Sequence, residues 1–204
     1  MIFRVAVGVI LLLASGRADA LLSEPIDDRI HAHICGGFGG IGMVSEYIQL
    51  LERRSWAPSA QLALDVGYSN VFGLELRADR SAGPHRGLTG TTPWLLVAEL
   101  NPIFALVRPN RGRTFCPFVS VGFGTGAKYL DGMGQGYSKG TVGTIGVDLK
   151  LLARYSQVGI SAEYRRITYG RFQAGTYVAE RPFDANAFTV HVRAGLGVGF
   201  RPPW

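Results

Sequence analysis

Side chains alternate between apolar and polar from residue 186 to residue 200, in the stretch NAFTVHVRAGLGVGF. Successive side chains of a β-strand point to opposite faces, so one face of this strand would be apolar throughout. The other would carry Thr189, His191, Arg193 and glycines. A strand averages about five or six residues, and this segment is roughly twice as long. The apolar face comprises Phe188, Val190, Val192, Ala194, Leu196, Val198 and Phe200.

The same alternation recurs in seven earlier segments, which brings the predicted number of strands to eight. These segments are residues 30–42, 61–69, 72–80, 94–106, 117–129, 142–152 and 158–166. The links between strands alternate in length along the chain. Long polar links lie near 43–58, 81–93, 129–141 and 170–185, and short links lie near 70–71, 108–114 and 154–156.

An even number of strands, with long links at one end and short links at the other, is typical of a bacterial outer-membrane barrel. Closure of the sheet also satisfies every backbone group in lipid, where an open edge would find no water. The sequence therefore predicts an all-β fold, an eight-stranded antiparallel up-and-down transmembrane β-barrel.

The first twenty residues have the form of a secretory signal peptide. A basic residue, Arg4, precedes an apolar stretch over residues 5–14, and Ala18-Asp19-Ala20 matches a signal-peptidase site. About ten apolar residues are too few to cross the hydrocarbon layer as a helix. We expect cleavage after Ala20 and a single barrel domain over residues 21–204.

The net charge of the chain limits the kinds of partner that we expect. Cleavage removes Arg4, Arg17 and Asp19 from the 21 basic and 15 acidic residues, which leaves a net charge of +5. The chain has no long basic run, so we expect no nucleic acid and favour anionic lipid headgroups as the partner. The two cysteines, Cys35 and Cys116, form no disulfide scaffold, and unpaired thiols are the favoured reading.

The apolar side chains could point into the barrel or out of it, because a soluble lipocalin-like barrel also has alternating strands. Three features favour apolar side chains pointing outward into lipid. The polar positions carry both signs of charge in near balance, as a cross-linked interior needs. Glycine is frequent at the same positions, where a narrow lumen has little room. Aromatic residues lie near strand ends, where the interface girdles of such barrels lie.

The polar positions would therefore form a connected network inside the lumen and close it to free passage. The predicted lumen network comprises His31, His33, Asp65, Glu75, Arg77, Asp79, Glu99, Asp148, Lys150, Glu163, Arg165, His191 and Arg193.

Residues 193–200 resemble the C-terminal β-signal of outer-membrane barrels. Arg193, Gly195, Val198 and Phe200 occupy its polar, glycine, hydrophobic and aromatic positions. The chain runs on to Trp204, so either aromatic could be the anchoring one. The chain as a whole resembles the OmpA-like and OmpX-like eight-stranded barrels. This resemblance implies a monomer in the bacterial outer membrane, inserted by the assembly machinery that reads the signal, and it implies no catalytic motif.

Catalysis is not expected. The lipid A deacylases, which are also eight-stranded barrels, carry a His-x-Ser pattern with a nearby Glu, and this chain has no His-x-Ser. The three histidines within strands fall on the predicted lumen face, away from acyl chains, and His85 lies in a predicted loop. A composite site of His191 with Ser161 and Glu163 on a neighbouring strand stays open.

We predict neither a metal nor a cofactor. His31 and His33 share one strand face, but two imidazoles without a clear third ligand are weak evidence for zinc. The stretch SEYIQLLERR from Ser45 is compatible with a short helix in the first long link, or with strands that continue above the membrane.

Two arginines occupy positions that the alternation assigns to the apolar outer face, each at the end of its predicted strand. Arg80 and Arg166 extend the outward-facing sets of their strands beyond Ala78 and Tyr164. From Phe72 to Arg80 the chain would climb roughly 21 Å, close to the apolar band of about 25 Å. We expect both guanidinium groups at headgroup level, where their planar fork suits the phosphates of lipopolysaccharide.

The predicted function is that of a non-enzymatic outer-membrane protein. It would have an envelope-structural role, or bind an unidentified surface ligand, through its four long external loops and its contact with lipopolysaccharide. A narrow pore for ions or small solutes and a lipid A-modifying enzyme are the alternatives.

Overall fold

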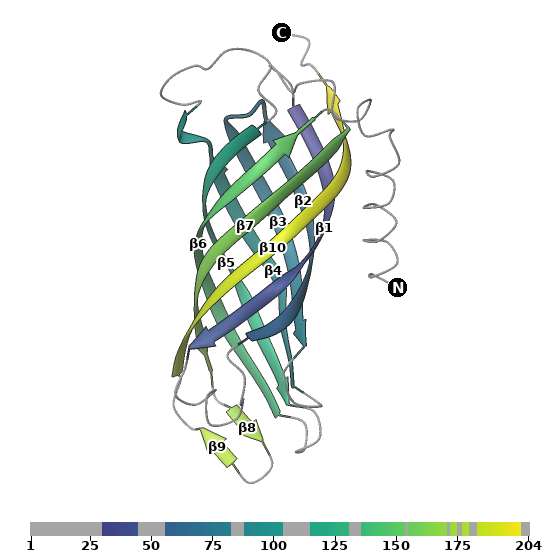
Figure 1. The fold of residues 1–204 in the computed structure, drawn as a ribbon. Helices are drawn as coiled ribbons and strands as arrows, with labels where there is room; N and C mark the ends of the chain where they lie inside the picture. The colour runs from purple at the N-terminus through teal and green to yellow at the C-terminus, as the bar shows by residue number, and fades with distance from the viewer. Residues whose placement is uncertain are drawn as a thin grey trace.

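Eight long antiparallel strands form a closed barrel, which confirms the predicted fold (Figure 1). The computed structural model describes residues 30–44, 56–82, 88–103, 115–130, 136–153, 155–170, 172–174, 177–179 and 183–200. The barrel strands are β1 (Ile30–Val44), β2 (Trp56–Tyr68), β3 (Phe72–Ala82), β4 (Leu88–Leu100), β5 (Phe115–Leu130), β6 (Gly136–Leu152), β7 (Ser156–Tyr169) and β10 (Phe183–Phe200). Each pairs with its neighbours in sequence, and β1 closes the ring by pairing with β10.

The two ends of the barrel differ, but three links depart in length from the prediction. Ile30 pairs with both Phe200 and Tyr68, so β1 begins and β10 ends at the rim that carries the tight turn between β2 and β3. The opposite rim carries the links over residues 45–55, 83–87, 131–135 and 170–182. Two of these, 83–87 and 131–135, are shorter than predicted, and the link over residues 101–114, at the rim of the tight turn, is longer than predicted. Within residues 170–182, β8 (Phe172–Ala174) and β9 (Tyr177–Ala179) form a small separate hairpin beyond the barrel wall (Figure 1). We call these ends the turn rim and the loop rim.

Most strands extend further toward the loop rim than the sequence predicted. β2 begins at residue 56 instead of 61, β6 at 136 instead of 142, and β10 at 183 instead of 186. The reason is physical, because backbone hydrogen bonding continues beyond the apolar band while alternation no longer does. Beyond the apolar band both faces of a strand can carry polar side chains, so period two no longer marks the strand.

One strand ends earlier than predicted. β4 stops at Leu100 rather than at residue 106, because Pro102 has no N–H to donate to the ladder. The Asn101 side chain then accepts a hydrogen bond from the Ile103 backbone N–H at 3.1 Å, which turns the chain.

β4 also contains a bulge near Pro93. Arg77 of β3 faces Leu95, whereas Asp79 faces Thr92, so β4 carries one extra residue at this point. The register of β4 with β5 shifts over the same stretch. The irregularity lies in β4 alone, so the alternation of β3 continues unbroken to Arg80.

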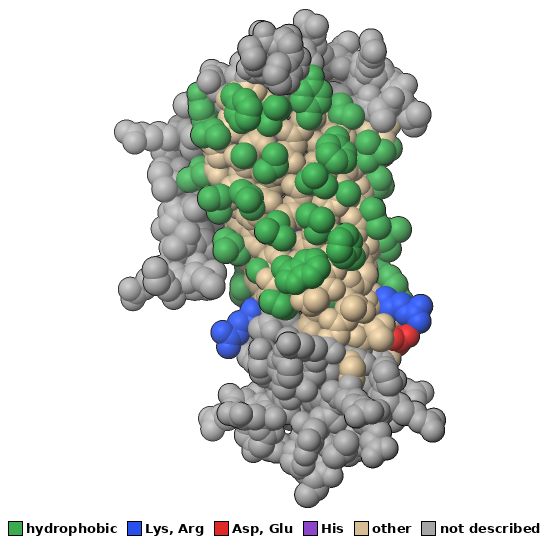
Figure 2. All heavy atoms as spheres, turned by 180° about the vertical axis from the view of Figure 1, so that it is seen from behind, with side chains coloured by type: hydrophobic (Ala, Val, Ile, Leu, Met, Phe, Trp, Pro, Cys, Tyr) green, Lys and Arg blue, Asp and Glu red, His purple; other side chains and the backbone are tan. Residues whose placement is uncertain are grey.

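Apolar side chains cover the outside of the barrel, as predicted. Ile34, Phe123 and Val192 expose 64, 61 and 57% of their surface, although they are among the most apolar residues of the chain. Figure 2 shows such side chains spread over the visible wall of the barrel. A soluble protein would bury this surface, whereas a lipid-facing barrel presents it to acyl chains.

Two small apolar clusters lie inside the barrel, which the sequence analysis did not foresee. Near the turn rim, Cys116, Phe118 and Leu152 pack together. A larger cluster holds Ile41, Leu95, Val97, Val142, Ile167 and Ala187. Its members occupy the inward parity, where only polar groups were predicted, and most of them come from the parts of their strands nearest the loop rim. The interior is thus charged in the middle and apolar toward both rims.

Several predictions concern parts of the chain outside the described residues. These are the signal peptide over residues 1–20, the possible helix from Ser45, His85, and residues 201–204. Within the described residues, no helix is long and apolar enough to cross a membrane.

Candidate functional site

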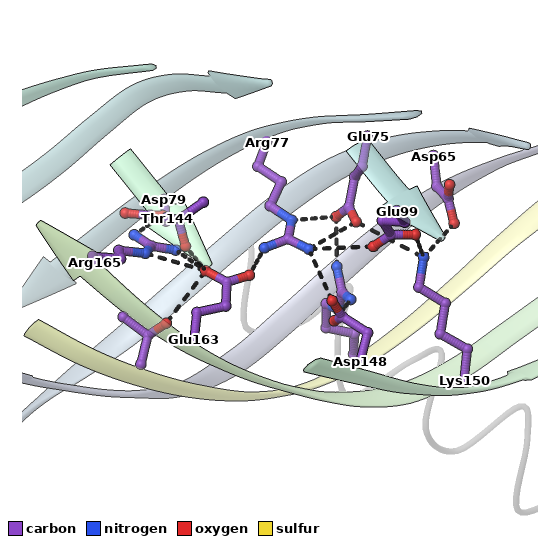
Figure 3. A network of polar contacts seen from close by, with 12 residues as sticks. Asp65, Glu75, Arg77, Asp79, Glu99, Thr144, Asp148, Lys150, Glu163 and Arg165 are labelled. Atoms are coloured by element: carbon purple, nitrogen blue, oxygen red, sulfur yellow. Dashed lines mark hydrogen bonds and ion pairs between the residues drawn. The ribbon is translucent and has the colours of Figure 1, made fainter. Parts of the chain in front are cut away.

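The buried charges inside the barrel form one connected network around Arg77 (Figure 3). The Arg77 side chain is fully buried and pairs with Glu75 at 2.7 Å. It also reaches Glu99 at 3.6 Å and Asp148 at 3.7 Å, and it contacts Glu163. One guanidinium group therefore joins carboxylates from strands on different sides of the lumen.

Arg193 and Lys150 extend the network toward the turn rim. Arg193 donates to Glu75 at 2.5 Å and to Asp148. Lys150 donates to Asp65 at 3.0 Å and to Glu99. These contacts join residues of β2, β3, β4, β6 and β10, which ties the barrel together across its interior.

Arg165 extends the network toward the loop rim. Its guanidinium group pairs with Asp79 at 2.6 Å and with Glu163 at 3.0 Å. Glu163 is also within 3.5 Å of the hydroxyl groups of Thr144 and Thr189. Isolated buried charges would be strongly unfavourable, and pairing of this density is what makes a charged interior compatible with a stable fold.

Glycine at inward positions makes room for these side chains. A Cβ at Gly146 would lie 2.7 Å from the Glu163 Cγ and 2.7 Å from the Ala162 carbonyl oxygen. The high glycine content of the strands is therefore a requirement of a narrow and filled lumen.

His191 does not form the composite site that the sequence left open. Its Nε2 lies 2.9 Å from the Ser59 hydroxyl, and the Ser161 hydroxyl has no hydrogen-bond partner among the described residues. Both serines are buried in the lumen, whereas the acyl chains of a lipid would lie outside the barrel. The serine that meets the imidazole is thus not the one that alternation suggested. Gly39 of β1 pairs with both His191 and Ser59, so the contact passes over this glycine from β10 to β2.

His31 and His33 lie together near the turn rim, with ring centroids 5.2 Å apart. Asp65 of β2 is directly opposite His33 in the register. One ligand atom from each of these three side chains lies within 4.8 Å of the other two. This third group was not predicted, because the pairing of β1 with β2 sets which carboxylate faces His33.

The outward arginines lie where the apolar surface ends toward the loop rim. Arg80 is exposed, and it has no ion pair among the residues that the structure describes. Arg166 is 68% exposed and pairs with Asp184 of β10 at 2.6 Å. Figure 2 shows basic side chains on both flanks of the barrel at the lower edge of the apolar surface, one of them beside an acidic side chain.

Asp184 was not foreseen as a partner, because it falls in a segment that the sequence predicted to be a loop. It accepts hydrogen bonds from Arg166 and from Thr168, and these bonds lower the pKa of its carboxyl. Tyr164, one step nearer the apolar surface, donates to Asn186 at 2.8 Å. The change from apolar to polar side chains on β7 and β10 thus occurs within one or two residues.

The residues that match the β-signal divide between the two faces of β10. Arg193 points into the charged network, and Gly195 packs against the Cys35 thiol of β1. Val198 and Phe200 are exposed on the outside by 57 and 52%. Cys35 and Cys116 are both buried and are not joined by a disulfide.

No protein-family model matches this sequence, and no curated protein matches it. Solved structures do match. Neisserial surface protein A is 12% identical, with a TM-score of 0.50 over 81% of this chain and 96% of that chain. The N-terminal β-barrel domain of Pseudomonas aeruginosa OprF is 14% identical, with a TM-score of 0.49 over 84% of this chain and 98% of that chain. The likeness to the Neisserial protein confirms the expected resemblance to outer-membrane barrels at the level of the fold.

Proposed function

We propose that this protein is a non-enzymatic barrel of the bacterial outer membrane that contacts lipopolysaccharide through Arg80 and Arg166. The observation that carries the proposal is the outer surface of the barrel. It is apolar along the strands, and its exposed guanidinium groups lie on the side of the loop rim. In such barrels the longer loops face the cell exterior, so this edge would meet the phosphate groups of the outer leaflet.

The interior supports a structural role rather than transport. Charged groups and two apolar clusters fill the lumen, so free passage of solutes is not expected. In this proposal the signal peptide over residues 1–20 directs export, and the assembly machinery reads Arg193, Gly195, Val198 and Phe200. The external loops would supply any surface ligand.

The ion pair of Arg166 with Asp184 is compatible with this role. Arginine has five N–H donors in a planar fork, so donors remain for a phosphate while one carboxylate is bound. Arg80 is open to a phosphate without exchange of a partner within the described residues. The two arginines are therefore expected to contribute unequally, with Arg80 the stronger contact.

The test measures lipopolysaccharide that co-purifies with the detergent-extracted barrel. We expect R80Q/R166Q to retain several-fold less lipopolysaccharide than the wild type, and R80K/R166K to retain an intermediate amount because it keeps the charge but loses the fork. D184N is the matched control. It removes the competing carboxylate, so retention should stay equal or rise. Heat-modifiable migration on gels checks that each variant is folded, and unchanged retention in R80Q/R166Q would refute the proposed contact.

A further inference from the structure

His31, His33 and Asp65 form a compact group of potential metal ligands inside the turn rim. They expose 2, 0 and 1% of their surface. One ligand atom from each lies within 4.8 Å of the other two. Small rotations of the side chains would bring these atoms to one ion, whose bonds to nitrogen and oxygen are about 2.0–2.2 Å long. The two imidazoles come from one face of β1, and the carboxylate comes from the paired position on β2.

Three buried polar atoms of this group have no hydrogen-bond partner within the described ranges of the chain. They are Nδ1 of His31, Nδ1 of His33 and Oδ1 of Asp65. Other buried lumen atoms, Nδ1 of His191 among them, also have no partner within the described residues, so what distinguishes this group is that three such atoms belong to side chains gathered around one point. A bound cation would satisfy all of them together.

The environment of His33 favours the ligand form of its ring. Its Nε2 lies 3.1 Å from the carbonyl oxygen of Ala153, which can only accept a hydrogen bond. The Nε2 therefore carries the proton, and the Nδ1 presents a lone pair. A backbone carbonyl that holds one ring nitrogen while the other is left for a metal is the usual outer arrangement of histidine ligands.

Two glycines shape the space that the rings occupy. A Cβ at Gly67 would lie 2.5 Å from Nε2 of His31, and a Cβ at Gly197 would lie 2.5 Å from Cδ2 of His33. A larger residue at either position would displace an imidazole. The rings are thus held in place by β2 and β10, whether or not an ion is bound.

The charge of the surrounding network also favours a cation. Six carboxylates face four permanent cations in the lumen, so the network carries a formal charge of −2 when its histidines are neutral. Lys150 is the nearest positive group, and it is held on Oδ2 of Asp65 and on Glu99. The other oxygen of Asp65, Oδ1, accepts no hydrogen bond within the part of the chain that the structure describes.

We propose that His31, His33 and Asp65 bind one divalent first-row transition ion, for which Zn²⁺ is the best fit. Two imidazole nitrogens and one carboxylate oxygen suit this ion, and a fourth position is left for water. The ion would join β1 to β2 next to the seam where β1 meets β10. It would act as a structural clamp at the turn rim, and this inference does not depend on the lipopolysaccharide contact.

The experiment uses the full barrel, refolded in detergent with a chelator and then dialysed. Co²⁺ serves as a spectroscopic substitute for Zn²⁺, followed by displacement with Zn²⁺. We expect one equivalent of Co²⁺ to give visible absorption bands of a four-coordinate site, and Zn²⁺ to abolish them. We also expect Zn²⁺ to raise the midpoint temperature of unfolding of the wild type.

The variants H31Q and H33Q keep polar side chains of similar size, and each should weaken Co²⁺ binding at least tenfold. D65N tests the carboxylate without changing its shape. H191Q is the matched control, because His191 is an equally buried lumen histidine that contacts Ser59 instead. H85Q controls for binding at the fourth histidine of the chain.

The proposal requires that H191Q and H85Q bind Co²⁺ like the wild type. Absence of binding to the folded wild-type barrel would overturn it, and so would binding that survives in both H31Q and H33Q. If one variant does not refold, the remaining two ligand variants decide the outcome. Heat-modifiable migration identifies the folded samples.

Discussion

Arg77 offers the most direct test of the idea that buried ion pairs hold the barrel together. Its fully buried guanidinium group contacts Glu75, Glu99, Asp148 and Glu163. The substitution R77M keeps a long side chain and so fills most of the same space. It removes the positive charge and leaves six carboxylates facing three permanent cations.

The size of the effect follows from the geometry. Removal of one partner from a buried pair costs about 3–5 kcal/mol, because the other charge stays buried without compensation. A change of 1.4 kcal/mol is tenfold, so the unfolding equilibrium constant should rise by roughly two to three and a half orders of magnitude. In the variant, Glu163 still pairs with Arg165 and Glu75 still pairs with Arg193. These two carboxylates are not left without a cation, so we expect the loss of stability to stay within this range.

The assay is urea unfolding of the barrel in lipid vesicles, followed by tryptophan fluorescence and by heat-modifiable migration. The double variant R77M/E163Q removes one of the uncompensated carboxylates and should recover about 1–3 kcal/mol of the loss, which measures the coupling of the pair. R166Q breaks an exposed ion pair of the same kind and serves as the control. If R77M unfolds like R166Q, the lumen network does not stabilise the barrel and the reasoning is refuted.

Three further predictions follow from the packing. G195A should destabilise the β1–β10 seam by about 1–3 kcal/mol, because a Cβ there meets the Cys35 thiol and the Ile34 carbonyl oxygen. G36A is the control and should fold normally, because no described atom lies within 4 Å of a Cβ at that position. Purified protein should give no large and stable single-channel current in planar bilayers, and such a current would contradict the filled lumen. L95A should lower stability by about 2–5 kcal/mol in the same urea assay, since Leu95 is fully buried in the larger apolar cluster. A loss of stability below that of a surface substitution would show that this cluster contributes nothing.

The sequence by itself determined where the eight barrel strands lie, apart from their ends, and which side chains within them point outward. Period-two alternation follows directly from strand geometry, so the outward position of Phe188 and the inward position of Glu163 could be read without a structure. Prediction failed where another effect replaced alternation. Strands that rise above the apolar band lose the pattern, and apolar residues such as Leu95 and Val97 occupy inward positions because the lumen needs volume as well as charge.

The tertiary structure decided which inward residues meet. Arg165 pairs with Asp79, 86 residues away, and Lys150 pairs with Asp65, 85 residues away. Alternation shows whether a side chain points into or out of the barrel, but not its position along the barrel axis. That position depends on the stagger between the tilted strands of a closed barrel. Pairing of neighbouring strands places Asp65 opposite His33 and Asp184 within reach of Arg166, so the candidate metal ligands and the partner of an outward arginine depend on strand register, which alternation alone does not give.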